Sequence, residues 1–367
     1  MTVDTEVKAS GSFKCTGCGA DLRYEAGTTF LTCSYCGAKN EIVVATVAIE
    51  ELDFETYLTQ AATQEEQISV YSIKCESCGA ISSVDPKIES TFCPYCSTPL
   101  IAKNARDEKM IRPRSLLPFK LNPENGKAEF KKWIDKLWFA PNALMKAALN
   151  FDHFKGVYLP YWTYDSATLS SYIGERGEYY YVQESYTTEE NGKTVTKTRQ
   201  VRHTRWYPAA GQVDHFFDDV ITCASTSVPT QYVNQLEPWD LPNLVPFDEK
   251  YLSGFTTEKY QIDLKQGFEI AKDVMHKEII SLAKQDIGGD EQRIISLDTK
   301  YSKITFKHIL LPAYISAYVF KGKLYRFLVN ARTGEVQGER PWSAAKIAFA
   351  VITGIVIIGV IYYLTQK

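Results

Sequence analysis

Eight of the nine cysteines in this 367-residue sequence stand in four C-x-x-C pairs. A two-residue gap lets both thiolates of a pair turn toward one point, and two pairs complete a tetrahedral four-sulfur site. The spacing predicts two such sites and favours structural zinc. A rubredoxin-like iron site uses the same ligands, so iron remains an alternative. The predicted ligands are Cys15, Cys18, Cys33 and Cys36 in the first site, and Cys75, Cys78, Cys93 and Cys96 in the second.

The two sites are copies of one another at an offset of 60 residues. Gly-Ala follows the first pair of each copy, and a tyrosine, Tyr35 or Tyr95, stands inside the second pair. This match outside the cysteines indicates an internal duplication. Four sulfurs saturate the metal, so no position is left for a catalytic water. We therefore expect two structural metal sites, and we expect no catalytic residue among these ligands.

The start of the chain, M-T-V-D-T-E-V-K, has no apolar segment of the kind found in secretory signals. We therefore expect the bulk of the chain to stay in the reducing cytosol, which disfavours disulfides. The ninth cysteine, Cys223, is most simply a buried free thiol.

Aromatic residues are frequent, with 23 Tyr, 18 Phe and 6 Trp, which favours a β-rich body. The expected fold class is α+β. The expected divisions are zinc ribbons at 1–47 and 73–104, a helical connector at 48–72, a linker with helices at 105–150, a β-rich body at 151–341 and a membrane anchor at 342–367.

Within these divisions, apolar residues at helical spacing predict helices over 124–138 and 261–286, the second ending at Gly288-Gly289. A second short helix is expected after Pro141. An aromatic run, the Asn191-Gly192 dipeptide and a basic return strand predict a β-hairpin over 178–207.

Residues 347–366 contain no charged side chain. At about 1.5 Å per residue, twenty helical residues span about 30 Å, which is the thickness of a hydrocarbon core. Trp342 and the pair Tyr362-Tyr363 lie near the two boundaries, as an aromatic belt requires. A buried core helix is the competing interpretation. The sequence favours a single-pass anchor in the cell membrane, with the N-terminal bulk in the cytoplasm.

Zinc ribbons often contact nucleic acid, but the charge of this region opposes that role. Residues 1–104 hold fourteen Asp/Glu and seven Lys/Arg, a balance of −7. Each zinc with four thiolates adds about −2. A phosphate backbone would be repelled. The one basic, aromatic stretch is 193–206, which we interpret as a solvated hairpin face balanced by glutamates. Its contact with anionic lipid headgroups, with protein or with nothing is left open.

Sequence signatures of catalysis are missing. No Walker A motif, H-E-x-x-H, G-x-S-x-G or dinucleotide fingerprint is present. The best acidic group is Asp214, His215, Asp218 and Asp219. On a regular strand these side chains alternate between two faces, which separates them. We therefore expect no enzyme.

Several sequence blocks carry a resemblance that covers nearly the whole chain. Besides the duplicated cysteine pairs, they are G-V-Y-L-P-Y-W-T-Y-D at 156–165, T-R-W-Y-P at 204–208, H-F-F-D-D-V at 215–220, L-E-P-W-D-L at 236–241, F-K-H-I-L-L-P at 306–312 and G-E-R-P-W-S at 338–343. The chain resembles bacterial zinc-ribbon membrane proteins often labelled primosomal protein N′ (replication factor Y), superfamily II helicase-like, or TFIIB-type zinc-ribbon proteins. Without a Walker A lysine, the residues do not support the helicase part of that label.

The resemblance implies a membrane-integral adaptor, because some relatives are associated with SPFH (flotillin-type) and phage-shock-type membrane-stress proteins. The expected function is a membrane-anchored scaffold that holds Zn²⁺ and docks cytosolic partner proteins at the inner membrane, as a homo- or hetero-oligomer. The alternative is a membrane-tethered, replication-associated nucleic-acid-binding protein.

Overall fold

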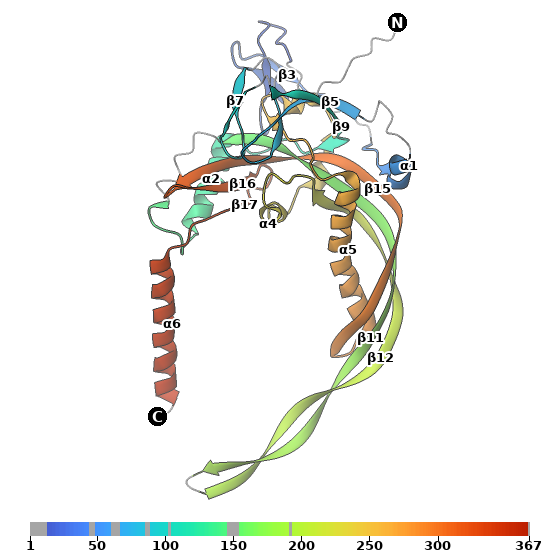
Figure 1. Ribbon diagram of the computed structural model, residues 1–367, viewed down its shortest axis with the longest axis vertical. Helices are drawn as coiled ribbons and strands as arrows, with labels where there is room; N and C mark the ends of the chain where they lie inside the picture. The colour runs from blue at the N-terminus through green and yellow to red at the C-terminus, as the bar shows by residue number, and fades with distance from the viewer. Residues whose placement is uncertain are drawn as a thin grey trace.

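A computed structural model of the chain describes residues 13–43, 48–59, 67–84, 89–101, 104–144, 154–190 and 193–365. Its largest feature is a strongly curved nine-stranded sheet, formed by long strands that run the height of the molecule (Figure 1). The two cysteine-rich regions lie on the convex side of the arch, and one long helix lies along its inner side (Figure 1). The expected α+β class is confirmed for the described residues.

The elements of the cysteine-rich half are short. They are β1 (Leu22–Tyr24), β2 (Phe30–Cys33), β3 (Lys39–Glu41), β4 (Leu52–Asp53), α1 (Phe54–Thr59), β5 (Gln67–Lys74), β6 (Ile81–Ser83), β7 (Ser90–Phe92), β8 (Pro99–Ile101) and β9 (Arg106–Ile111).

The remaining elements build the body and the C-terminal helix. They are β10 (Ser115–Leu116), α2 (Pro123–Asp135), β11 (Lys155–Glu190), β12 (Lys193–Cys223), α4 (Thr230–Asn234), η3 (Leu241–Asn243), β13 (Val245–Pro246), η4 (Glu249–Leu252), β14 (Thr256–Thr257), α5 (Leu264–Ile287), β15 (Glu291–Phe320), β16 (Lys323–Asn330), β17 (Val336–Gly338) and α6 (Ala344–Thr365).

The long hairpin of β11 and β12 organises the main sheet. The two strands pair from Tyr161↔Cys223 to Glu190↔Lys193, so the predicted hairpin at 178–207 is the outer part of a much longer one. The predicted turn residues 191–192 lie outside the described residues. On its other edge β11 pairs with β15, but only as far as Gly177↔Glu291. Beyond Gly177 the hairpin therefore continues as a two-stranded ribbon (Figure 1).

A β-bulge interrupts this hairpin near the body. The register shifts between Tyr164 and Ser166, and Asp219 adopts a left-handed φ of 52°. The Asp219 backbone N–H donates to the Asp165 carboxylate at 2.7 Å, which secures the irregular turn of the chain. The bulge breaks the strict alternation that we expected for residues 214–219, because an extra residue shifts which side chains share a face.

Helix α5 confirms the predicted long helix and covers the inner face of the sheet. It starts with a capping box, in which the side chains of Asp263 and Gln266 each accept from the other's backbone N–H. It stops at Gly288, whose φ is 66°. Its buried side packs on β11, and Gly267 permits close approach to Trp162 and Tyr164.

The cysteine-rich regions share their hydrophobic cores with the body. Tyr24 and Leu31 of the first region pack in one cluster with Phe119 of the body. Tyr95 of the second packs in another cluster, with Leu159 among its members. Burial of these side chains together stabilises the docking of both regions onto the sheet.

Some predicted segments have a different structure or are not described. Arg106–Ile111, expected in a linker, forms strand β9, which pairs with β5 of the second cysteine-rich region. In the expected helical connector, α1 covers only Phe54–Thr59, and Gln67 already begins β5. Residues 1–12 of the expected first ribbon, and most of the short helix expected after Pro141, at 145–149, lie outside the described residues.

Helix α6 extends from the body with no buried residue among its 22. Of the described helices, it alone is long and apolar enough to cross a membrane. This exposure argues against the core-helix interpretation, because such a helix would be covered by other elements. It is held at its first turn, where the Lys346 ammonium donates to the Ala140 carbonyl at 2.8 Å.

Candidate metal centres

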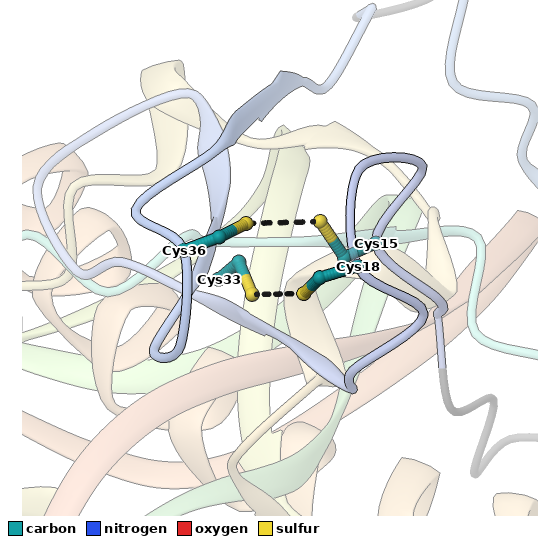
Figure 2. A group of neighbouring side chains, drawn as sticks. All are labelled: Cys15, Cys18, Cys33 and Cys36. Carbon is teal, nitrogen blue, oxygen red and sulfur yellow. Dashed lines mark hydrogen bonds between the residues drawn. The ribbon is translucent and has the colours of Figure 1, made fainter.

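The structure brings the eight predicted cysteines together in two groups of four. Within each group all four Sγ atoms lie within 4.8 Å of one another. In the first, Cys15 and Cys36 are 3.5 Å apart, as are Cys18 and Cys33 (Figure 2). In the second, the equivalent distances are 3.6 Å for Cys75–Cys96 and 3.5 Å for Cys78–Cys93.

These separations fit a shared metal. Four thiolates at about 2.3 Å from a tetrahedral ion stand about 3.8 Å from one another. A disulfide would need about 2.05 Å, so none of these pairs is a disulfide. Both groups could therefore hold a metal ion, and their geometry is that of zinc-ribbon sites.

Each knuckle is a tight turn closed by its own backbone. The N–H four residues after the leading cysteine donates back to that cysteine's carbonyl, as in Gly19 to Cys15 at 2.9 Å. The donor residue has a positive φ in all four knuckles. Three are glycines, at φ of 74°, 73° and 80°, and the fourth is Ser97 at 59°. Sequence reasoning found the leading glycines, Gly19 and Gly79, and missed Gly37 and Ser97, although the same spacing from the cysteine marks all four.

The two groups differ in exposure. Cys18 and Cys36 of the first group are exposed, whereas Cys78 and Cys96 of the second are half-buried. The difference is larger at the paired tyrosines. Tyr35 is 84% exposed, whereas Tyr95 is completely buried. The duplicated knuckles therefore face different surroundings: one points into solvent and the other into the body.

Tyr95 enters a buried polar network around Glu258. Its hydroxyl donates to one carboxylate oxygen of Glu258. The other oxygen accepts from Ser225 at 2.8 Å, from Gln261 at 2.9 Å and from Ser227. Burial raises the pKa of Glu258 despite these donors. The network provides hydrogen-bond donors to a fully buried carboxyl group. One of these donors is Tyr95, so the full set is present only when the second ribbon is docked on the body.

One segment of the body, residues 248–261, holds both cysteine-rich regions. Ser253 donates from its hydroxyl to the Leu22 carbonyl at 2.6 Å, and its own carbonyl accepts from the Tyr24 N–H at 3.0 Å. Six residues on, the Lys259 N–H donates to the Ile81 carbonyl at 3.0 Å. Each region therefore uses its equivalent edge strand, β1 or β6, to dock on this segment.

A second polar cluster lies at the bulge of the long hairpin. The buried Lys307 ammonium is 2.8 Å from the Glu51 carboxylate and 2.7 Å from that of Asp219. The Thr305 hydroxyl lies 2.9 Å from the Glu51 carboxylate and 2.8 Å from that of Asp165. Burial raises the pKa of Asp165 to about 6, and its neighbour Glu51 adds to that effect. The bulge thus brings Asp219 into a part-buried ion-pair network around Lys307. Local sequence patterns could not reveal this network, since Glu51 and Lys307 are far from Asp219 in sequence.

Two further candidates from the sequence, Cys223 and the basic hairpin at 193–206, lie among the described residues. Cys223 is buried, and burial raises the pKa of its thiol to about 12, which favours the neutral thiol. In the basic hairpin, Arg199 pairs with Glu184 at 3.3 Å, and the Arg202 guanidinium stacks 4.2 Å from the Tyr179 ring. The expected balance of basic side chains by glutamate is seen at Glu184.

Comparison with known proteins gives one similarity along nearly the whole chain. The chain is 25% identical over 342 residues to the uncharacterized protein YdjG of Bacillus subtilis (strain 168), which covers 92% of each chain. No protein-family model matches, and no solved structure matches. The similarity therefore extends through the cysteine-rich regions and the body. It lends no support to a primosomal or TFIIB-type label, and the relative's name states no activity.

Proposed function

We propose that this protein is a non-enzymatic, membrane-anchored adaptor whose two cysteine groups bind structural Zn²⁺ and whose first zinc ribbon docks a cytosolic partner protein. The observation that carries the proposal is the contrast between Tyr35 and Tyr95. The second copy of the duplicated module inserts its knuckle tyrosine, Tyr95, into the surface of the body. The first copy has a chemically similar knuckle, and its tyrosine, Tyr35, is exposed. The second copy supports the idea that this type of knuckle can bind a protein surface, because the Tyr95 hydroxyl donates a hydrogen bond to a buried carboxylate of the body.

Charge supports protein over nucleic acid as the partner. Near the described knuckles, the basic side chain of Lys14 is paired with Asp21 at 2.6 Å. Four thiolates and one Zn²⁺ leave about −2 at each site. A phosphate backbone gains nothing at such a surface, whereas an aromatic ring with a hydroxyl suits a protein surface.

Helix α6 supports the membrane part of the proposal. Its apolar side chains are uncovered along the whole helix, which a bilayer would satisfy. In Figure 1 the charged hairpin and α6 extend to the same side of the body. Lysine or arginine at the hydrocarbon centre costs about 2.5–3.5 kcal/mol or more each, so the two cannot share that depth. We propose that α6 reorients at Pro341–Ser343 on insertion, leaving the hairpin and body in the cytoplasm.

Photo-crosslinking tests this function in native membranes. A photoreactive phenylalanine analogue at Tyr35 should give a discrete protein adduct, whereas the same analogue at the exposed Leu58 should not. Adducts with nucleic acid, or none at Tyr35, would reject the docking surface. Protease should degrade the body only from the cytosolic side of sealed vesicles. Metal analysis should give two zinc ions per chain; iron would reject the zinc assignment.

A further inference from the structure

The outer part of the long hairpin has one face rich in exposed apolar side chains, which no described element covers. We name the distal face as the even-numbered residues 178–188 of β11 together with the odd-numbered residues 195–207 of β12, which the register places on one side. The described hairpin residues at 176–190 and 193–207 include six exposed large apolar side chains. Five of these six lie on the distal face. Those five are Tyr180, Val182, Tyr186, Val195 and Tyr207, each 37–41% exposed.

The same face is covered by α5 closer to the body. There Tyr172 packs against Ala283 and Ile287 of the helix, and its hydroxyl donates to Asp286 at 2.6 Å. Helix α5 ends at Ile287, and the hairpin continues past it (Figure 1). The distal face is therefore the uncovered continuation of a face that is packed elsewhere. A two-stranded ribbon without a second layer is only marginally stable in water.

The charges of the ribbon are segregated by strand. From residue 178 to 190, β11 carries glutamates and no lysine or arginine, whereas β12 carries basic residues and no acid from 193 to 213. On the distal face, Glu178 lies opposite Arg205, and Glu184 lies opposite Arg199. Each of these rows across the ribbon thus has a negative side on β11 and a positive side on β12.

We infer that the distal face binds the distal face of a second copy of this chain, stacked in parallel about a two-fold axis along the hairpin. Such an axis puts β11 of one copy over β12 of the other at the same level. Glu184 then faces Arg199 of the other copy, and Val182 faces Val201. An antiparallel stack would instead put β11 over β11 and bring glutamates together. The charge pattern therefore selects the parallel arrangement, which is isologous.

The parallel arrangement also suits a membrane-anchored chain. With the axis normal to the bilayer, both copies of α6 can enter the same membrane. The two-stranded ribbon is about 43 Å long and about 10 Å wide, since strands rise about 3.3 Å per residue. Stacking buries about 800 Å² in total, which is below the about 1,200–2,000 Å² of a standard specific interface and is the size of a weak contact. Confinement of both chains to one membrane raises their effective concentration, which helps a contact of this size to form.

A charge-exchange experiment on the full chain tests the inference. Donor- and acceptor-labelled chains, reconstituted together into vesicles of neutral phospholipid, report association by energy transfer. Glu184→Arg alone and Arg199→Glu alone should each weaken association about tenfold, because like charges then face each other across the interface. A mixture of the two variants should recover association. The arginine introduced at position 184 of one chain then faces the glutamate introduced at position 199 of the other. Neither chain regains the ion pair between positions 184 and 199 within itself, so recovery reports the contact between chains.

The controls use the opposite face. Gln183→Arg and Gln200→Glu, which lie opposite each other there, should leave association unchanged. As an independent readout, chains with Val182→Cys mixed with chains with Val201→Cys should form an intermolecular disulfide, whereas Gln183→Cys with Gln200→Cys should not. A monomeric wild type, association that survives both charge reversals, or a mixture that fails to recover would each overturn the inference.

Discussion

Tyr95 and Glu258 stand 163 residues apart in sequence, and the hydroxyl of the first donates to the buried carboxylate of the second. This contact joins a cysteine knuckle to the body. The equivalent tyrosine of the first knuckle, Tyr35, makes no such contact with any described residue and is exposed. One duplicated module is thus an internal structural element, and the other presents a similar surface to solvent.

Removal of the Tyr95 hydroxyl should therefore destabilise the protein. In Tyr95→Phe, Glu258 loses one donor in a fully buried site, which should lower the free energy of unfolding by about 1–3 kcal/mol. Tyr35→Phe is the matched control, and its effect should lie within about 0.5 kcal/mol. Denaturant unfolding of both variants measures the difference. Equal effects would contradict the asymmetry.

The two metal sites should differ in their rates of metal loss. Two of the four cysteines of the first site are exposed, whereas those of the second are buried or half-buried. A chelator should therefore remove the metal in two phases, with the first site released faster. In Cys18→Ser the fast phase should disappear, and in Cys78→Ser the slow phase should disappear. Absorbance of a zinc indicator follows both phases, and the reverse assignment would show that exposure does not control release.

The buried His308 should make stability depend on pH. Its Nδ1 is 2.8 Å from the Ile111 carbonyl, and its Nε2 is buried without a partner in the described structure. Burial lowers the pKa of His308 to about 4. Between pH 6.5 and 4 the unfolded chain binds more protons, so this contribution to stability falls by about 1.4 kcal/mol per pH unit as the pH drops.

His308→Gln isolates this term, because it removes the titrating group. The difference in unfolding free energy between wild type and variant should be constant above about pH 7 and should shrink as the pH falls below about 6.5. A difference that stays constant down to about pH 5 would show that His308 does not titrate as inferred. Other acid-sensitive groups, including the cysteine sites, are common to both proteins and cancel in the comparison.

A charge at the middle of α6 should impair membrane insertion. Val356→Lys puts an ammonium near the centre of the apolar helix, at a cost of about 2.5–3.5 kcal/mol. Ile347→Lys near its first turn should cost much less, because the side chain can reach the interface. Carbonate extraction of membranes measures the retained fraction. Retention of both variants at the wild-type level would argue against a membrane span.

Prediction from sequence succeeded where the signal is local. Cysteine spacing identified two four-sulfur groups, because ligands on tight turns converge through local geometry. Helical periodicity identified α5, and Asn191-Gly192 placed the two strands of the hairpin. At Asp219 a bulge breaks the strand alternation that was expected for residues 214–219. Its partners Glu51 and Lys307 come from distant segments, which no local pattern reveals.

The sequence by itself determined the ligand groups, the sheet-rich body and the apolar terminal helix, because spacing, periodicity and hydropathy act over a few residues. Only the tertiary structure decided which copy of the duplicated module has its knuckle tyrosine buried in the body and which has it exposed. The two copies are almost alike in their local chemistry, and they differ because residues 248–261 bring Glu258 to Tyr95 and no described residue to the hydroxyl of Tyr35. Such a difference arises from packing between residues far apart in sequence, which local sequence patterns do not predict.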